Sequence, residues 1–216
     1  MFRMLSAFAA VGLLILQTDT AGAAKMQNAQ TVIANVAKST HAPRSFKAAT
    51  QLQLKQRSFP FTKVALSGTS YFQAPNRLAV RFTNVPGYMS GLPEAYAMVL
   101  NVGAWPQEYN ASLSQPQNVN GHTDLALSLT PKSPQSSDRG VALVNPANWT
   151  VERVDWNLSG GVSLTMTEAY TDVDSYRLPS SQELSIHTPY ATADGSATLQ
   201  NYAVNVPIDG QIFTQE

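Results

Sequence analysis

The sequence of 216 residues contains no cysteine. This absence excludes disulfides, thiolate nucleophiles and metal sites with cysteine ligands. It also excludes lipidation at cysteine, which an exported bacterial lipoprotein requires directly after its signal. We therefore expect a protein that is not anchored through an acyl chain of its own.

Charge is scarce and balanced. Charged residues make up 13% of the chain, with 14 Lys and Arg against 14 Asp and Glu, whereas an average soluble protein has roughly 25%. A chain without basic excess has no electrostatic footprint for nucleic acid. A surface with few charges is suited to a protein whose partner is apolar.

Histidine is also rare, at His41, His122 and His187. None has a partner at metal-ligand spacing, so we expect scattered histidines, no metal site and no cofactor, although three histidines could still assemble in space. The chain has no Gly-x-Ser-x-Gly elbow, and Asp172-Val-Asp174 is typical of a solvated turn, so no catalytic residue is expected. A cluster of His122 or His187 with carboxylates in a pocket would instead favour an enzyme.

The N-terminus has the pattern of an export signal. Arg3 precedes the apolar stretch Leu5 to Leu16, and Ala21-Gly22-Ala23 forms a small-residue cleavage site. The stretch is short for a membrane span of about 20 residues. An uncleaved anchor is the alternative, and the small-residue site argues against it. We expect a cleaved signal over residues 1–23 and one domain over residues 24–216.

One amphipathic helix is predicted from Lys25 to Ser39, because its apolar residues recur every three or four positions. After Pro43 the apolar residues recur at every second position instead, which predicts strands nearly to the C-terminus. The expected strands are Phe46 to Lys55, the hairpin Gly68 to Phe82, Tyr96 to Val102, Gln107 to Leu113, Thr123 to Thr130, Arg139 to Val144, Thr150 to Leu158, Val162 to Tyr170, Tyr176 to Leu178, Glu183 to Ile186 and Ala197 to Val206. Turn residues at Asn120-Gly121, Ser159 to Gly161, Asp194-Gly195 and Asp209-Gly210 predict antiparallel neighbours.

The hairpin has one apolar face, and Pro75 marks its corner because proline cannot donate to a sheet. Other strands repeat this one-sided pattern. These faces could form the core of a closed sandwich or line the concavity of a curved sheet plugged by the N-terminal helix and by ligand. In the second case the predicted lining residues are Val64, Leu66, Phe72, Leu78, Val80, Phe82, Tyr96, Met98, Leu125, Leu127, Trp156, Leu164 and Met166.

The segment Asn84 to Glu94 is rich in glycine and proline but carries Tyr88, Met89 and Leu92. These features are typical of a mobile lid over an apolar opening. An ordinary crossover loop on the rim explains the segment equally well.

The order of these features resembles the superfamily of outer-membrane lipoprotein carriers (LolA-type). A signal, a helix and a strand are followed by Gly68 and then Pro75-Asn76, and later by Leu129-Thr130-Pro131-Lys132 and Val141 to Val154. The C-terminal Leu178-Pro179, Asn201-Tyr202 with Asn205, and Ile212-Phe213 are also similar to the lipoprotein-sorting group.

The resemblance implies a mainly β fold, an incomplete (half) antiparallel β-barrel wrapped around the N-terminal helix. It further implies a non-catalytic, monomeric periplasmic carrier for the acyl chains of lipoproteins or lipids. Its expected partners are membrane transfer proteins of the inner and outer membranes, and no nucleic acid is expected. The alternative is an envelope protein-interaction or sensing module with the same fold and a filled core.

The sequence departs from the proteobacterial carriers at two places. Ala74 stands where they have an arginine that helps to control lipid binding and release. The stretch from Phe82 to Leu129 is also shorter than theirs, which argues against their lid helix. The resemblance therefore implies lipid binding more directly than dedicated lipoprotein traffic.

Overall fold

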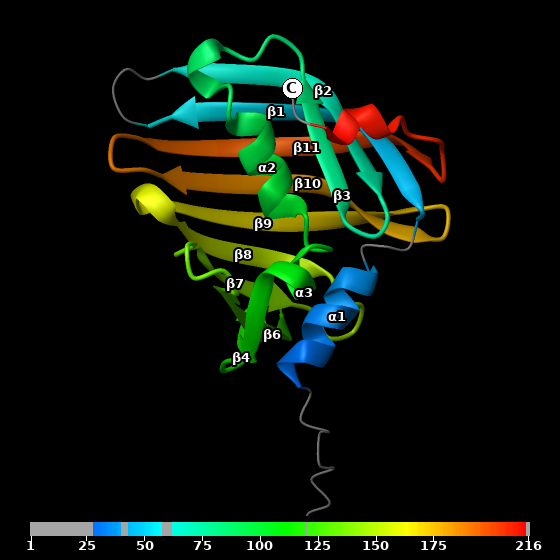
Figure 1. Ribbon diagram of the computed structural model, residues 1–216, viewed down its shortest axis with the longest axis vertical. Helices are drawn as coiled ribbons and strands as arrows, with labels where there is room; N and C mark the ends of the chain where they lie inside the picture. Colours follow the sequence, from blue (N-terminus) through cyan, green and yellow to red (C-terminus); the bar gives the residue numbers. More distant parts are fainter. Residues whose placement is uncertain (1–27, 40–42, 58–61, 120, 215–216) are drawn as a thin grey trace, which may run out of the picture.

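A computed structural model describes residues 28–39, 43–57, 62–119 and 121–214. The expected export signal, the start of the predicted helix at Lys25, and His41 lie outside the described residues. Figure 1 shows one large curved sheet with the helices on its near side. The strand order is β3-β2-β1-β11-β10-β9-β8-β7-β6-β4, with β5 also paired to β6, and every pairing is antiparallel. No described strand joins the two edges, β3 and β4, so the sheet is an open half-barrel.

The strands are β1 (Ser45–Gln56), β2 (Lys63–Gln73), β3 (Arg77–Phe82), β4 (Tyr109–Leu113), β5 (Gln117–Val119), β6 (His122–Pro131), β7 (Arg139–Val144), β8 (Val151–Leu158), β9 (Val162–Val173), β10 (Tyr176–His187) and β11 (Thr192–Val204). The helices are α1 (Ala29–Ser39), α2 (Leu92–Leu100) and α3 (Trp105–Glu108), with short 3-10 turns at η1 (Gly87–Met89), η2 (Ser159–Gly161) and η3 (Gly210–Phe213). The expected mainly β class is confirmed.

The predicted hairpin is formed by β2 and β3, and in its register Gly68 pairs with Phe82 and Phe72 with Leu78. Gly68 has no room for a side chain, because an added Cβ would lie 2.2 Å from the carbonyl oxygen of Arg81. Glycine at position 68, which has no side chain, thus permits the close approach of β3 to β2.

Three local predictions are wrong. Residues 96–102, expected as a strand, form most of α2 and the turn after it. Asp194-Gly195, expected as a turn, lies inside β11. The two short strands expected from Tyr176 and from Glu183 are one strand, β10, in which the register shifts between Pro179 and Ser181. Pro179 still pairs with Tyr170, and Ser180 directly after it has no partner in β9, so the irregularity follows a residue that cannot donate a ladder hydrogen bond.

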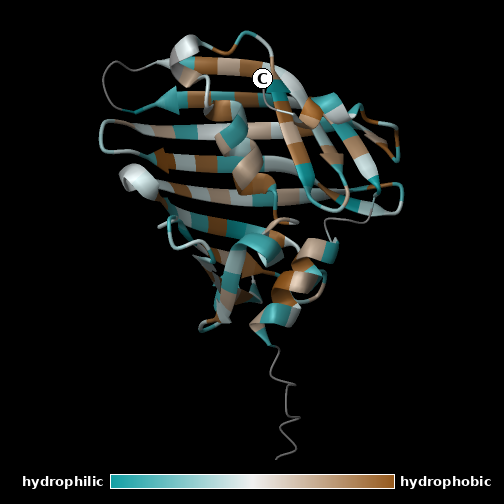
Figure 2. Cartoon of the chain, in the orientation of Figure 1, coloured by the Kyte–Doolittle hydropathy of each residue, from teal (hydrophilic) through white to brown (hydrophobic). Residues whose placement is uncertain are grey.

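The helices cover different halves of the sheet. Val32, Ile33 and Val36 of α1 are fully buried, and α1 contacts β4, β6 and α3. Helix α2 contacts β3 and lies in front of the middle strands in Figure 1. Figure 2 shows apolar and polar bands alternating along the strands, as a sheet with one buried face requires.

Candidate functional site: a cavity beneath α2

Helix α2 begins where Pro93 occupies one of its first two positions, where a missing N–H is tolerated. Tyr96 and Val99, three residues apart, are buried, whereas Met98 is 44% exposed. This is the periodicity of a helix with one face on the sheet. The predicted lining residue Met98 therefore points away from the interior.

Three contacts hold α2 against the sheet. The Tyr96 hydroxyl donates a hydrogen bond to Oε1 of Gln182 on β10. The Tyr96 ring lies 6.0 Å from the Phe82 ring, centroid to centroid. At the C-terminal end, Nδ2 of Asn101 donates to the carbonyl oxygen of Asn76 at 2.8 Å.

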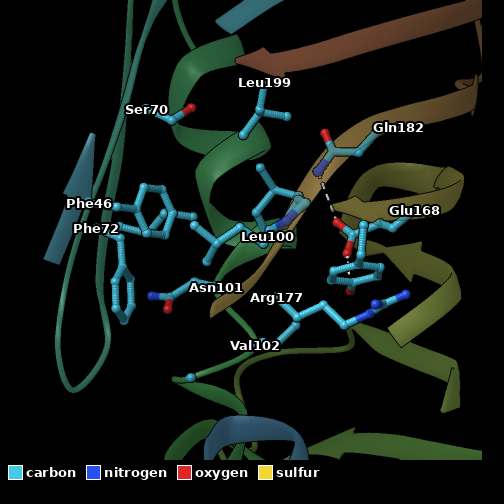
Figure 3. A pocket seen from close by; sticks show the side chains of 15 residues that line it. Phe46, Ser70, Phe72, Leu100, Asn101, Val102, Glu168, Arg177, Gln182 and Leu199 are labelled. Atoms are coloured by element: carbon cyan, nitrogen blue, oxygen red, sulfur yellow. Dashed lines mark hydrogen bonds between the residues drawn. The ribbon is translucent and has the colours of Figure 1, made fainter. Parts of the chain in front are cut away.

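A cavity of about 60 Å³ lies beneath the C-terminal end of α2 (Figure 3). It extends across the inner face from β3 to β9. Its apolar walls are Phe46, Phe72, Leu78, Leu100, Val102, Leu178, Pro179 and Leu199, and its polar groups include Ser70, Asn101, Glu168, Tyr170, Arg177 and Gln182. A space of this size holds a few water molecules.

A chain of hydrogen bonds crosses the cavity wall from α2 to β8. Tyr96 donates to Gln182, and Nε2 of Gln182 donates to Oε1 of Glu168 at 2.9 Å. The Tyr170 hydroxyl lies 2.5 Å from Oε2 of Glu168 and 2.9 Å from the carbonyl oxygen of Val151. Because a hydroxyl has one proton, Tyr170 can donate to both oxygens only in turn.

A protonated Glu168 satisfies every group in this chain, since it donates to Tyr170 and leaves the Tyr170 proton for Val151. Burial, countered in part by the hydrogen bonds from Tyr170 and Gln182, raises the pKa of Glu168 from 4.5 to about 7. The cavity therefore contains a carboxyl group that changes charge near neutral pH.

Most of the predicted lining residues come together on the inner face. Leu66, Val80, Tyr96, Leu127, Trp156 and Met166 are buried in one core cluster, and Val64, Leu78, Phe82, Leu125 and Leu164 pack against it. Phe72 belongs to a second cluster with Phe46 and Leu199. Of the predicted set, the cavity is bordered by Phe72 and Leu78.

The expected lid segment contains η1 and the beginning of α2, so a helix stands where the sequence argued against one. Met89 and Leu92 pack against the core cluster. The side chain of Tyr88 lies outside the described part of the chain.

Sequence reasoning missed Glu168, Tyr170 and Gln182. The alternation that places Leu164 and Met166 inward also places Glu168 and Tyr170 inward, so the signal was present on β9. Gln182 pairs with Glu168 across the ladder, and this long-range register could not be read from the sequence.

The structure also brings His122 together with Asp124 and Glu152, although the sequence predicted no ligand set around any histidine. His122 and Asp124 are two residues apart on β6, which places them on one side of that strand. None of the three borders the cavity beneath α2.

No protein-family model matches the chain, and no curated protein sequence does. Solved structures of similar fold include the following three. A DUF1329 family protein from Desulfovibrio piger is 12% identical and has a TM-score of 0.64, over 86% of this chain and 95% of that one. A LolA superfamily protein from Nitrosomonas europaea is 10% identical with a TM-score of 0.64, over 88% and 98%.

The fold is LolA-like. A putative outer membrane lipoprotein-sorting protein domain from Vibrio parahaemolyticus agrees, with 12% identity and a TM-score of 0.62 over 85% of this chain and 95% of that one. At these identities the likeness concerns the LolA-like fold alone. Among the described residues, no helix has the length and apolar character needed to cross a membrane.

Proposed function

We propose that this protein is a non-catalytic periplasmic carrier that binds acyl chains of lipoproteins or lipids on the inner face of its half-barrel. The observation that carries the proposal is the apolar cavity between the open sheet and α2, a short helix with a small set of anchoring contacts. The LolA-like fold and the lipoprotein-sorting name of one structural relative support the same class of cargo.

The cavity is far smaller than an acyl chain, so binding requires α2 to move. Burying a chain of about sixteen carbons at about 0.8 kcal/mol per methylene would release on the order of 13 kcal/mol, which is too much for a carrier that must unload. Displacing α2 from its buried contacts offsets part of that gain. The closed cavity is thus compatible with a carrier that binds moderately and releases.

The test is titration of the purified protein with a fluorescent fatty-acyl probe. We expect saturable binding that unlabelled lipid displaces. Leu100→Trp, which fills the cavity from α2, should weaken binding at least tenfold, whereas Leu113→Trp, on the exposed part of β4, should not. Absence of displaceable binding would overturn the proposal.

The second candidate is an envelope protein-interaction module. It is favoured by one observation, namely that α2 and the protein's own side chains already occupy most of the inner face. On this hypothesis the probe does not bind, and Leu100→Trp affects stability alone. The same titration therefore separates the two functions.

A further inference from the structure

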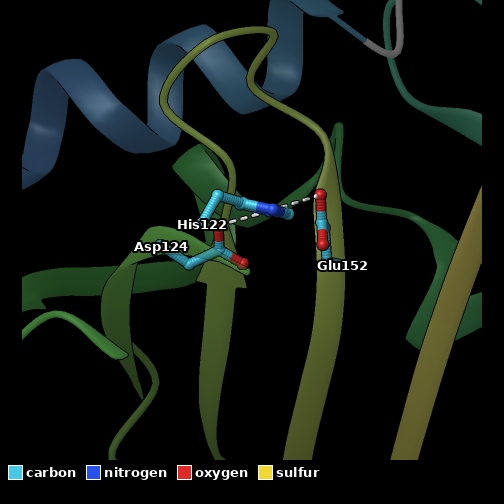
Figure 4. Close-up of side chains that lie close together, drawn as sticks. All are labelled: His122, Asp124 and Glu152. Atoms are coloured by element: carbon cyan, nitrogen blue, oxygen red, sulfur yellow. Dashed lines mark hydrogen bonds and ion pairs between the residues drawn. The ribbon is translucent and has the colours of Figure 1, made fainter. Parts of the chain in front are cut away.

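His122, Asp124 and Glu152 form a compact group at one end of β6 and β8 (Figure 4). The ligand-type atoms of the three residues all lie within 4.8 Å of one another. Nε2 of His122 is 3.0 Å from Oε1 of Glu152 and 3.1 Å from Oδ1 of Asp124. Two ligands bound about 2.1 Å from one ion at 90–109° are separated by roughly 3.0–3.4 Å, so these spacings match neighbouring positions around a metal.

A sheet irregularity assembles the group. Val144 pairs with Val151 and Leu143 with Arg153, so Glu152 has no partner in the β7 ladder. A bulge of this kind re-aims a side chain and recurs next to functional sites. Leu125 pairs with Val144, which places Asp124 opposite the position of Asn145 and within reach of Glu152.

Asp124 is the independent observation that points to a ligand. Its side chain is 0% exposed, and neither carboxylate oxygen has a hydrogen-bond partner among the described residues. A buried carboxylate in this state is strongly disfavoured unless it is paired or coordinates a metal. Its Oδ1 atom is aimed at Nε2 of His122.

Protein donors do not balance the acceptors of this group. The oxygen of the Asn145 amide accepts the N–H of Ala147, which turns its nitrogen toward Glu152 at 2.9 Å and toward Nε2 of His122 at 3.2 Å. When Nε2 accepts from Asn145, it has no proton for either carboxylate. When Nε2 is protonated, it can donate to Oδ1 of Asp124 while Asn145 donates to Glu152, but Oδ2 of Asp124 still has no partner among the described residues.

We propose that His122, Asp124 and Glu152 bind one divalent transition-metal ion, with Zn²⁺ the first expectation. The mixed nitrogen and carboxylate donors suit Zn²⁺ better than the oxygen-only sites typical of Ca²⁺ or Mg²⁺. The His122 side chain is 38% exposed, which provides an entry path and a position for water. The ion would join β6 to β8 beside the turn that contains Trp149, whose carbonyl oxygen bonds to the Ser39 hydroxyl at the end of α1 at 2.9 Å.

Isothermal titration of the metal-free protein with Zn²⁺ tests this site. We expect one equivalent per chain and a rise in the unfolding temperature. His122→Gln and Asp124→Asn should each weaken the affinity at least tenfold. His187→Gln, which removes an exposed histidine bonded to Thr192, is the matched control and should bind as the wild type does.

The wild-type protein supplies a second readout that does not depend on the folding of any variant. Co²⁺ should bind with one equivalent, give visible ligand-field absorption and be displaced by Zn²⁺. Absence of binding by both ions, or Zn²⁺ binding equal in His122→Gln and Asp124→Asn to that of the wild type, would overturn the proposal. Binding that His187→Gln abolishes would overturn it too.

Discussion

Glu168 makes the stability of the protein depend on pH. Its pKa is about 7 in the folded chain, against an ordinary value of 4.5. Between these values the folded state binds more protons than the unfolded state, so the free energy of unfolding falls as pH rises, by up to about 3 kcal/mol. This contribution is fully present below about pH 4.5 and is lost as pH passes through 7.

Glu168→Gln should remove that dependence. Its amide can accept from Gln182 and donate to Tyr170, as the protonated carboxyl does. We expect urea denaturation between pH 5 and pH 8 to show a flatter profile, with the variant more stable than the wild type at pH 8. Glu183→Gln, exposed on the same hairpin, is the control. A variant with the wild-type slope would contradict the assignment to Glu168.

Gly140 allows an aromatic cluster to form on the inner face. It pairs with Trp156, and an added Cβ would lie 2.8 Å from two ring carbons of that tryptophan. The Trp156 ring packs 6.0 Å from Trp105 and 5.2 Å from Tyr109, between centroids. A displaced Trp156 would therefore disturb both neighbours.

Gly140→Ala should lower the free energy of unfolding by about 1–3 kcal/mol, the usual range for overpacking. Chemical denaturation followed by tryptophan fluorescence measures the loss. Gly91→Ala is the control, because nothing lies within 4 Å of an added Cβ there. Equal stability of the two variants would mean that the cluster adjusts freely.

At the scale of elements, strands were predicted correctly where apolar and polar residues alternate over a long stretch. The prediction was wrong where the same apolar residues fit both the period of a strand and the period of a helix. Tyr96, Met98 and Leu100 alternate as a strand does, but Tyr96, Val99 and Leu100 fit a helix equally well. Pro93 was the sign of a helix start. Strand pairing and the irregularity at Glu152 arise from contacts between distant segments, so neither the Glu168 network nor the His122 cluster could be fully predicted.

Helix α2 should be easier to displace when its hydrogen bond to β10 is removed. Tyr96→Phe leaves Oε1 of Gln182 without its buried donor, at a cost of about 1–2 kcal/mol in stability. Because opening then requires less free energy, the affinity for an acyl probe should rise several-fold. Tyr190→Phe, at a position 93% exposed, should change neither quantity. An unchanged affinity in Tyr96→Phe would show that α2 does not gate the cavity.

At the scale of the whole molecule, the half-barrel combines a continuous hydrogen-bonded sheet with a short helix, α2, that covers part of its inner face. Strands β1, β11, β10 and β9 each have partners on both sides. Helix α2 has nine residues, no side-chain cap at its N-terminus, and packs mainly against the edge strand β3. Local unfolding begins where such contacts are fewest.

The rate of amide hydrogen exchange should therefore differ between segments of the protein. Peptides from α2 and from the edge strand β3 should exchange before those from β9, β10 and β11. An acyl ligand that displaces α2 should change exchange in α2 and β3 while the ladder of the middle strands stays protected. Exchange of all these segments together would show that the cavity opens by global unfolding, which is incompatible with a carrier that loads by moving one helix.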